Sequence, residues 1–268
     1  MCLIAIAFHS CRQYPLIIAA NRDEFYNRPT AALDYWDDQP DILAGRDLEG
    51  MGTWLGMSTS GRIAAITNFR DPGAMAPKSR GPSRGLLVSE FLSSTDPPQT
   101  YLEKLHASNT VYSGFNLLVG NMGELWWYSN VGEHMQALTP GIQAISNHLL
   151  NTPWPKVEKI KTELAAILDA GRPPEAEALF ARLADQRRPP DSDLPDTGIG
   201  LEWERTLSPV FISSPVYGTR ASSVIFIDRS GQATFYERTF PVANSPVFPG
   251  GTRRFDFCIQ AENPDSSG

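Results

Sequence analysis

Residues 1–30 read MCLIAIAFHSCRQYPLIIAANRDEFYNRPT and contain two apolar runs, at 3–8 and 16–20. Residues 9–15, HSCRQYP, separate the runs and carry turn-forming residues with a proline. Short apolar runs bounded in this way are typical of β-strands. Two further runs, GTWLGMS at 52–58 and GRIAAITNF at 61–69, are divided by a TSG turn. The first 70 residues therefore predict hairpins of an antiparallel sheet.

The rest of the chain alternates blocks of helices and blocks of strands. Helices are predicted at 83–94, 97–108, 152–170 and 173–186, and strands at 114–121, 123–130, 141–147 and within 222–240. This order does not follow a βαβα pattern, and the chain has no glycine-rich nucleotide-binding motif. We therefore expect an α+β fold, a four-layer α-β-β-α sandwich with two antiparallel sheets. Residues 1–260 are expected to form a single domain, followed by a flexible tail at 261–268.

Residues 187–209 are polar and rich in proline, and they predict a mobile loop long enough to act as a lid or a binding loop.

Composition excludes several classes of protein. The chain has 268 residues and a net charge of −7, and it has no basic cluster long enough to follow phosphates, so no nucleic-acid partner is expected. Three cysteines without a CxxC motif predict neither a disulfide framework nor a zinc site. The four histidines lack metal-ligand spacing, so no metal is expected, although one histidine could be an axial haem ligand. The apolar run at 3–8 is too short for a membrane span or a signal peptide, which predicts a soluble cytoplasmic protein. The oligomeric state stays open.

Cys2 has two interpretations. It is either a buried residue at the start of a strand or, once Met1 is removed, an N-terminal nucleophile. An α-amine with a pKa of about 8 is partly neutral near pH 7 and can accept the thiol proton. The resulting thiolate would attack an amide or thioester carbonyl.

The polar run at 21–24 ends the second predicted strand. Strand alternation places Asn21 and Asp23 on one face and Arg22 and Glu24 on the other. If this strand pairs with residues 3–8, Asp23 comes close to the chain start and orients the α-amine. The alternative is a solvated turn.

Three more polar residues, Asn68, Asn147 and Arg220, stand at the tips of apolar runs. Asparagine amides suit an oxyanion hole, and arginine suits a carboxylate or phosphate. The alternative is that they cap turns.

The motifs MCLIAIAF, LIIAANRDEFYNRPT and GTWLG together resemble the NRDE family, also called the Transport and Golgi organisation 2 family. GFNLLVG, LTPGIQAISNHLLNTPWPKV and YGTRASSVIFIDRSGQATFYER extend the resemblance over essentially the whole chain. The family is similar to N-terminal-nucleophile (Ntn) hydrolases of the cysteine acylase type, which share the sandwich expected above. The resemblance implies Cys2 as nucleophile, Asp23 beside the α-amine, and Asn147 and Asn68 as oxyanion donors. One position departs from the acylases: Ala20 stands where their arginine precedes the aspartate by three residues, and Arg22 is expected to point the other way.

Three functions remain open. The first is a cysteine amidohydrolase or thioesterase acting on an acyl-type small molecule, with no cofactor. The second is a non-catalytic carrier of haem or an acyl-CoA-like lipid, which the family's links to haem movement and lipid metabolism imply. The third is a trafficking partner that uses only its surface, since the family is linked to Golgi organisation and secretion. The residues expected to hold a ligand are Asn21, Arg22, Glu24, Trp54 and Arg220.

Overall fold

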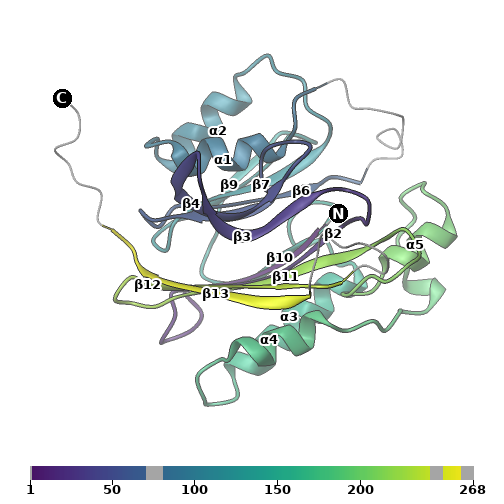
Figure 1. The fold of residues 1–268 in the computed structure, drawn as a ribbon. Coiled ribbons are helices and arrows are strands. Elements are labelled where there is room, and N and C mark those ends of the chain that lie inside the picture. The colour runs from purple at the N-terminus through teal and green to yellow at the C-terminus, as the bar shows by residue number, and fades with distance from the viewer. Residues whose placement is uncertain (1, 71–80, 242–249, 261–268) are drawn as a thin grey trace.

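Two stacked antiparallel sheets with helices on their outer faces make up the protein (Figure 1). The structure is a computed structural model and describes residues 2–70, 81–241 and 250–260. This architecture confirms the four-layer α-β-β-α sandwich expected from the sequence. The tail predicted at 261–268 lies outside the described residues.

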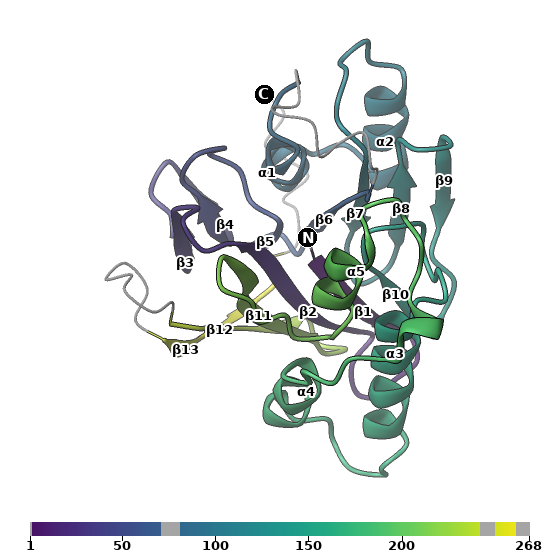
Figure 2. The same cartoon turned by 90° about the vertical axis from the view of Figure 1, so that its right-hand side faces the viewer.

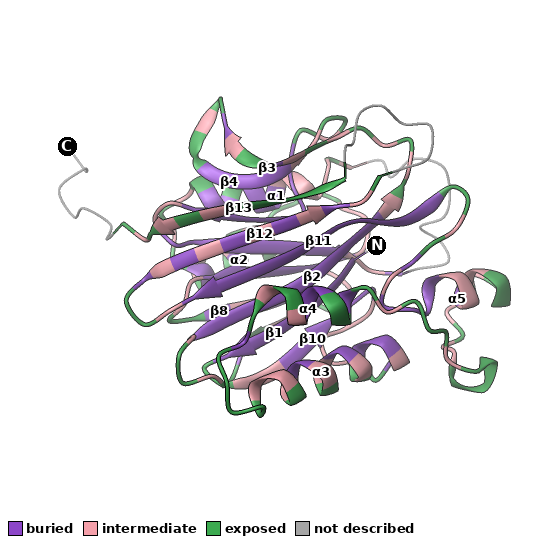
Figure 3. Ribbon diagram, turned by 60° about the horizontal axis from the view of Figure 1, so that its bottom comes forward, coloured by how far each residue is buried: buried purple, intermediate pink, exposed green. Residues whose placement is uncertain are grey.

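Sheet A has six strands in the order β10-β1-β2-β11-β12-β13. Its strands are β1 (Cys2–Phe8), β2 (Leu16–Phe25), β10 (Gly141–Ile145), β11 (Tyr217–Ile227), β12 (Gln232–Thr239) and β13 (Gly251–Cys258). The central strands β1 and β11 are buried along their whole length because both faces of the sheet are covered (Figure 3). A strand buried on both faces reads as a continuous apolar run, which is how β1 stands out in the sequence.

Sheet B has seven strands in sequence order, from β3 to β9. They are β3 (Thr30–Trp36), β4 (Gln39–Asp47), β5 (Leu55–Ser58), β6 (Ile63–Asn68), β7 (Phe115–Gly120), β8 (Leu125–Ser129) and β9 (His134–Ala137). The predicted hairpins of the first 70 residues are therefore divided between two sheets, with β1–β2 in sheet A and β5–β6 in sheet B. The sequence did not predict β3, β4, β9 and β13, because these strands interrupt their apolar residues with charged or polar ones.

Helices cover the outer face of each sheet (Figure 2). Helices α1 (Gly85–Ser93) and α2 (Pro98–His106) lie on sheet B, and α3 (Pro155–Leu168) and α4 (Ala176–Leu183) lie on sheet A. Side chains between the two sheets form the main core, and a second core lies between sheet A and its helices. Successive side chains of β1 and β2 thus face either the other sheet or α3 and α4, and this division decides where each polar residue of 21–24 points.

The connection predicted at 187–209 contains regular structure. A 3₁₀ turn, η2 (Asp191–Asp193), and a short helix, α5 (Leu201–Leu207), lie within it. Leu207 packs with Ile212 and Tyr217, and Trp203 lies against this cluster. The prediction of a loop without helices was therefore wrong at α5, where apolar residues at helical spacing anchor a helix. This helix lies close to the end of the sandwich at which β1 begins (Figure 2).

Candidate functional site

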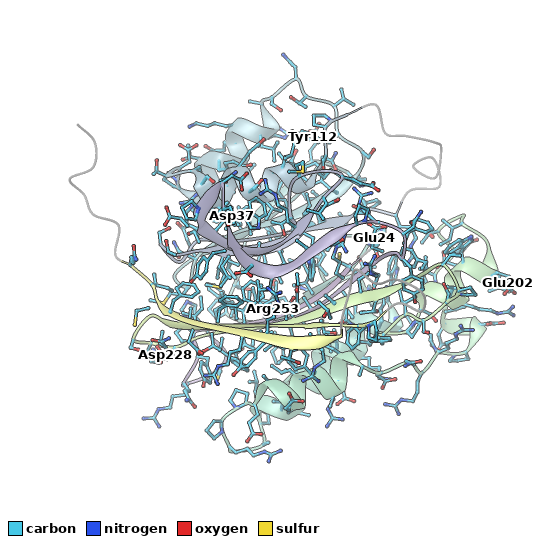
Figure 4. All side chains as sticks on the ribbon, viewed as in Figure 1. Glu24, Asp37, Tyr112, Glu202, Asp228 and Arg253 are labelled. Carbon is cyan, nitrogen blue, oxygen red and sulfur yellow. The ribbon has the colours of Figure 1, made fainter. Side chains whose placement is uncertain are left out.

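A cavity of about 370 Å³ lies at the end of the sandwich where β2 ends and β1 begins. Figure 4 labels Glu24 at this end of the two sheets. Among the sequence-predicted site residues, seven line the cavity: Cys2, Arg22, Asp23, Glu24, Trp54, Asn68 and Arg220. The fold therefore brings most of the candidates together from four strands and a loop.

Cys2 opens β1 and is only 7% exposed. The β1–β2 register pairs it with Arg22, which also faces the space between the sheets. Burial raises the pKa of the Cys2 thiol, against a smaller lowering by the Arg22 charge. At neutral pH the thiol therefore keeps its proton unless a neighbouring base removes it.

Asp23 lies one residue beyond the Cys2–Arg22 pair, next to the start of β1. It is buried, its Oδ1 accepts a hydrogen bond of 2.7 Å from Thr219 Oγ1, and its backbone carbonyl accepts one of 2.8 Å from the Tyr217 hydroxyl. Burial raises the pKa of the Asp23 carboxyl, and the positive charge of Lys156 is the largest influence that lowers it. The position agrees with the sequence-based expectation of an aspartate beside the chain start.

Asn68 and Asn147 are neighbours but occupy different places. Asn68 ends β6 on the cavity wall, and the Nδ2 of Asn147 donates a hydrogen bond of 2.9 Å to the backbone carbonyl of Asn68. Asn147 is fully buried, and its Oδ1 accepts a hydrogen bond of 3.2 Å from the Ser146 hydroxyl. This arrangement makes Asn147 a support for the Asn68 backbone, one layer behind the cavity.

Asn21 lies outside the cavity, on the side of sheet A that faces the helices. Its Nδ2 donates to the carbonyl oxygens of Leu183 and Val210 at 2.9 and 2.8 Å, and its Oδ1 accepts from the Ser222 hydroxyl at 2.6 Å. These bonds tie β2 to the end of α4 and to the segment before β11. The structure thus places Asn21 as a structural crosslink rather than among the cavity residues.

The arginines of the cavity are held by protein oxygens. Arg22, expected to point away from the site, instead lines the cavity because its face of β2 is the face that Cys2 shares; its Nη1 donates to Thr30 Oγ1 at 3.1 Å. Arg220 Nη1 donates to three backbone carbonyls, those of Phe25, Tyr26 and Arg28. Five arginines line the cavity in all: Arg22, Arg28, Arg46, Arg84 and Arg220.

Acidic side chains offset part of this charge. Arg28 Nη2 and Asp47 Oδ2 lie 2.7 Å apart, and Glu24 and Glu237 also line the cavity. Glu237 is buried and accepts a hydrogen bond of 2.7 Å from the backbone N–H of Leu33; burial raises its pKa to about 6. The cavity is therefore lined by charges of both signs, five arginines together with Asp23, Glu24, Asp47 and Glu237.

Sequence reasoning missed Arg84, Glu237 and Lys156. Glu237 could have been recognised from the sequence, because it occupies a core-facing position in β12, a strand in which buried and half-buried residues alternate strictly. Lys156 could have been recognised in a similar way, because it precedes Val157 and lies on the buried side of α3. A charged residue at an apolar position of a periodic element is the pattern that identifies both.

Two kinds of feature are absent from the described residues. Within residues 2–70, 81–241 and 250–260, no three His, Cys, Asp or Glu side chains group as metal ligands. Over the same part of the chain, no helix combines the length and apolar character needed to cross a membrane.

Comparison with solved structures supports the fold. A variant of the conjugated bile acid hydrolase from Clostridium perfringens superposes with a TM-score of 0.50 over 99% of this chain and all of that chain, at 9% identity. A Caenorhabditis elegans N-acylethanolamine-hydrolyzing acid amidase ortholog gives a TM-score of 0.49 over 83% of this chain and 92% of that chain, also at 9% identity. The superposition on the bile acid hydrolase variant thus shows an Ntn-hydrolase-like fold.

Sequence comparison identifies the family. The profile described as Transport and Golgi organisation 2 matches residues 1–241. A Bos taurus protein described as a Transport and Golgi organization protein 2 homolog is 39% identical over 89% of this chain and 93% of its own length. The Homo sapiens homolog is 34% identical over 97% of this chain and its full length. The chain therefore belongs to the Transport and Golgi organisation 2 family.

Proposed function

We propose that the protein is an N-terminal cysteine hydrolase that cleaves an amide or thioester of an acyl-type small molecule. The observation that supports this most strongly is the position of Cys2 on the cavity wall, with Asp23 beside the start of β1 and Asn68 on the same wall. The fold shared with a conjugated bile acid hydrolase is compatible with the proposal but does not by itself establish an activity.

The proposed reaction begins with removal of Met1, which frees the α-amine of Cys2. That amine accepts the thiol proton, and Sγ forms a bond to the substrate's carbonyl carbon while the carbonyl electrons move to oxygen. Donors at Asn68, supported by Asn147, stabilise this oxyanion. The intermediate then breaks its C–N or C–S bond, and the amine or thiol leaves with the proton. Water hydrolyses the acyl–cysteine thioester to a carboxylic acid and restores the thiol.

Intact mass and turnover together test this proposal. Protein made in its native host should lack Met1, and a panel of acyl amides and acyl thioesters should yield at least one substrate. Cys2→Ala should abolish turnover, whereas Cys258→Ser is the matched control because Cys258 is exposed on β13. Retention of Met1, or equal turnover by Cys2→Ala, would refute the proposed mechanism.

A second candidate follows from the five cavity arginines. We propose as the alternative that the cavity binds an anionic, partly apolar molecule such as haem or acyl-CoA without cleaving it, in the Golgi-related role that the family description names. Arginine recognises carboxylates and phosphates through paired N–H groups. Titration with haemin and with an acyl-CoA should then show saturable binding that Arg84→Met weakens. No saturable binding at micromolar protein would reject this alternative.

A further inference from the structure

Ser146 lies directly after β10, at the point where that strand leaves β1. Strand β2 pairs with β1 as far as Cys2, whereas the pairing of β10 with β1 stops at Ile4, opposite Ile145. Cys2 therefore extends beyond the end of β10. On that side the Oγ of Ser146 donates a hydrogen bond of 3.1 Å to the backbone carbonyl of Cys2. Both residues are buried, and a hydrogen bond is stronger in such surroundings than in water.

The same hydroxyl also faces Asn147. Ser146 Oγ lies 3.2 Å from Asn147 Oδ1, and its one proton is shared between this oxygen and the Cys2 carbonyl. The Nδ2 of Asn147 donates to the backbone carbonyl of Asn68 at 2.9 Å. This fixes the orientation of the amide, because a carbonyl oxygen only accepts hydrogen bonds and would repel Oδ1. Two neighbouring side chains thus connect Cys2, at the start of β1, with Asn68, at the end of β6.

Further hydrogen bonds attach this two-residue segment to sheet B. Thr67 Oγ1 donates to the Ser146 carbonyl at 2.6 Å, and the backbone N–H of Arg70 donates to the Asn147 carbonyl at 2.7 Å. Asn116, on β7, donates in turn to Thr67 Oγ1 at 3.2 Å. All five residues are buried. The segment is therefore fixed to the end of β6 while it holds the start of β1.

The proposed reaction needs groups from both sheets at one place. Cys2 belongs to sheet A and Asn68 to sheet B, and both line the cavity. Once Met1 is removed, Cys2 is the first residue of the chain, and chain ends are poorly ordered unless contacts hold them. Pairing with β2 holds one side of Cys2, and Ser146 holds the other. A misplacement of about 1 Å between reacting groups can lower a rate about 100-fold.

We propose that Ser146 is a positioning residue: its hydroxyl, together with Asn147, fixes the Cys2 end of β1 relative to Asn68 on the opposite sheet. The proposal rests on the proposed function, in which Cys2 attacks a carbonyl carbon and Asn68 stabilises the oxyanion. Ser146 lies behind the cavity wall and acts through the backbone of Cys2 and the side chain of Asn147.

Alkylation of Cys2 tests the proposal without any need for turnover. The rate of modification by iodoacetamide is followed by tandem mass spectrometry, which distinguishes Cys2 from Cys11. Ser146→Ala should accelerate the modification of Cys2 at least about fivefold, the change expected when one buried hydrogen bond is lost. Ser129→Ala is the matched control, because Ser129 is also buried and donates to a backbone carbonyl, that of Phe115, at 3.1 Å. Equal rates in the wild type and Ser146→Ala would overturn the proposal.

Turnover of any substrate found in the acyl panel gives a second readout. Ser146→Ala should lower kcat at least about tenfold and leave KM within about twofold, because misplaced reacting groups affect the transition state and not ground-state binding. Ser129→Ala should change neither constant, even where it lowers the stability of the fold. A wild-type kcat in Ser146→Ala would contradict a positioning role.

A third measurement uses the wild type and needs no variant that might fail to fold. The backbone amide of Leu3, opposite Asn21, should exchange with solvent as slowly as that of Ala5, which lies two residues further along β1. Exchange at Leu3 more than about tenfold faster would show that the start of β1 opens locally despite Ser146, and would reject the proposal.

The outcomes separate this proposal from the proposed function, since neither alkylation nor amide exchange depends on turnover. Faster alkylation of Cys2 in Ser146→Ala, in a protein that cleaves nothing, supports the link between the sheets and rejects the hydrolase. An active enzyme in which the alkylation of Cys2 does not respond to Ser146→Ala does the reverse.

Discussion

Removing one partner of the Arg70–Glu204 ion pair should destabilise the fold far more than removing an exposed ion pair. The two side chains are 5% and 4% exposed, and Glu204 Oε1 also accepts hydrogen bonds from the backbone N–H and hydroxyl of Thr197. Breaking a buried ion pair typically costs about 3–5 kcal/mol, because it leaves a buried charge without compensation. For Glu204→Gln we expect the lower end, about 3 kcal/mol, since the remaining Arg70 charge still lies over the Trp154 ring at 4.6 Å from its centroid.

Urea denaturation of both single variants and of Arg70→Met/Glu204→Gln measures this as a double-mutant cycle. The double variant should lose at least about 2 kcal/mol less than the sum of the two single losses, because no charge is left unpaired in it. Arg205→Met is the control: Arg205 is on the same helix, pairs with Asp191 at the surface, and should leave the unfolding midpoint almost unchanged. Single losses below about 1 kcal/mol, or losses that add in the double variant, would refute the reasoning.

Three further predictions concern stability. Burial raises the pKa of Glu237 from 4.5 to about 6, so this group stabilises the fold by about 2 kcal/mol below its unfolded pKa and loses that contribution as the pH rises through about 6. Glu237→Gln should flatten this part of the pH profile of urea unfolding, and an unchanged profile would contradict it. Asn21→Leu should lower the free energy of unfolding by about 2–4 kcal/mol, because two backbone carbonyls and a serine hydroxyl lose their partner. The alkylation rate of Cys2 in the folded protein should stay at the wild-type value. Gly52→Ala should lower the thermal midpoint, because its Cβ would lie 2.3 Å from the backbone carbonyl carbon of Gly85, whereas Gly251→Ala meets nothing within 4 Å and should have no effect.

The sequence predicted those elements of the fold whose periodicity is strong. The uninterrupted apolar run of β1 predicts a buried strand, and the apolar spacing of α3 predicts a helix with one buried face. Neither prediction needs knowledge of distant parts of the chain. Strand β13 could not be predicted in the same way, since most of its residues are exposed and its pairing with β12 depends on distant parts of the chain. Helix α5 was missed because prolines and acidic residues around it are typical of a loop.

The sequence predicted the part of the site that depends on the pairing of β1 with β2. Pairing of β1 with β2 places Asp23 beside the chain start, which the sequence anticipated from adjacency alone. Arg22 was misjudged because alternation was counted from Asp23, whereas the register shows that Cys2 shares the face of Arg22. Lys156 was missed because its buried ammonium group depends on the carbonyl of Leu207 in a separate helix, and no local pattern specifies that contact.

The thiol of Cys2 places a condition on any catalytic function of this cavity. Burial raises its pKa, so the thiol needs a base at hand to become a nucleophile. The Asp23 carboxylate already accepts a hydrogen bond from Thr219, and its side chain leaves β2 on the face opposite to that of Arg22, the strand partner of Cys2. A free α-amine on Cys2 has a pKa of about 8 and would meet the condition on the same residue. Cleavage therefore requires that Met1 be removed, whereas anion binding by the cavity arginines does not, and the mass of the native chain separates the two functions.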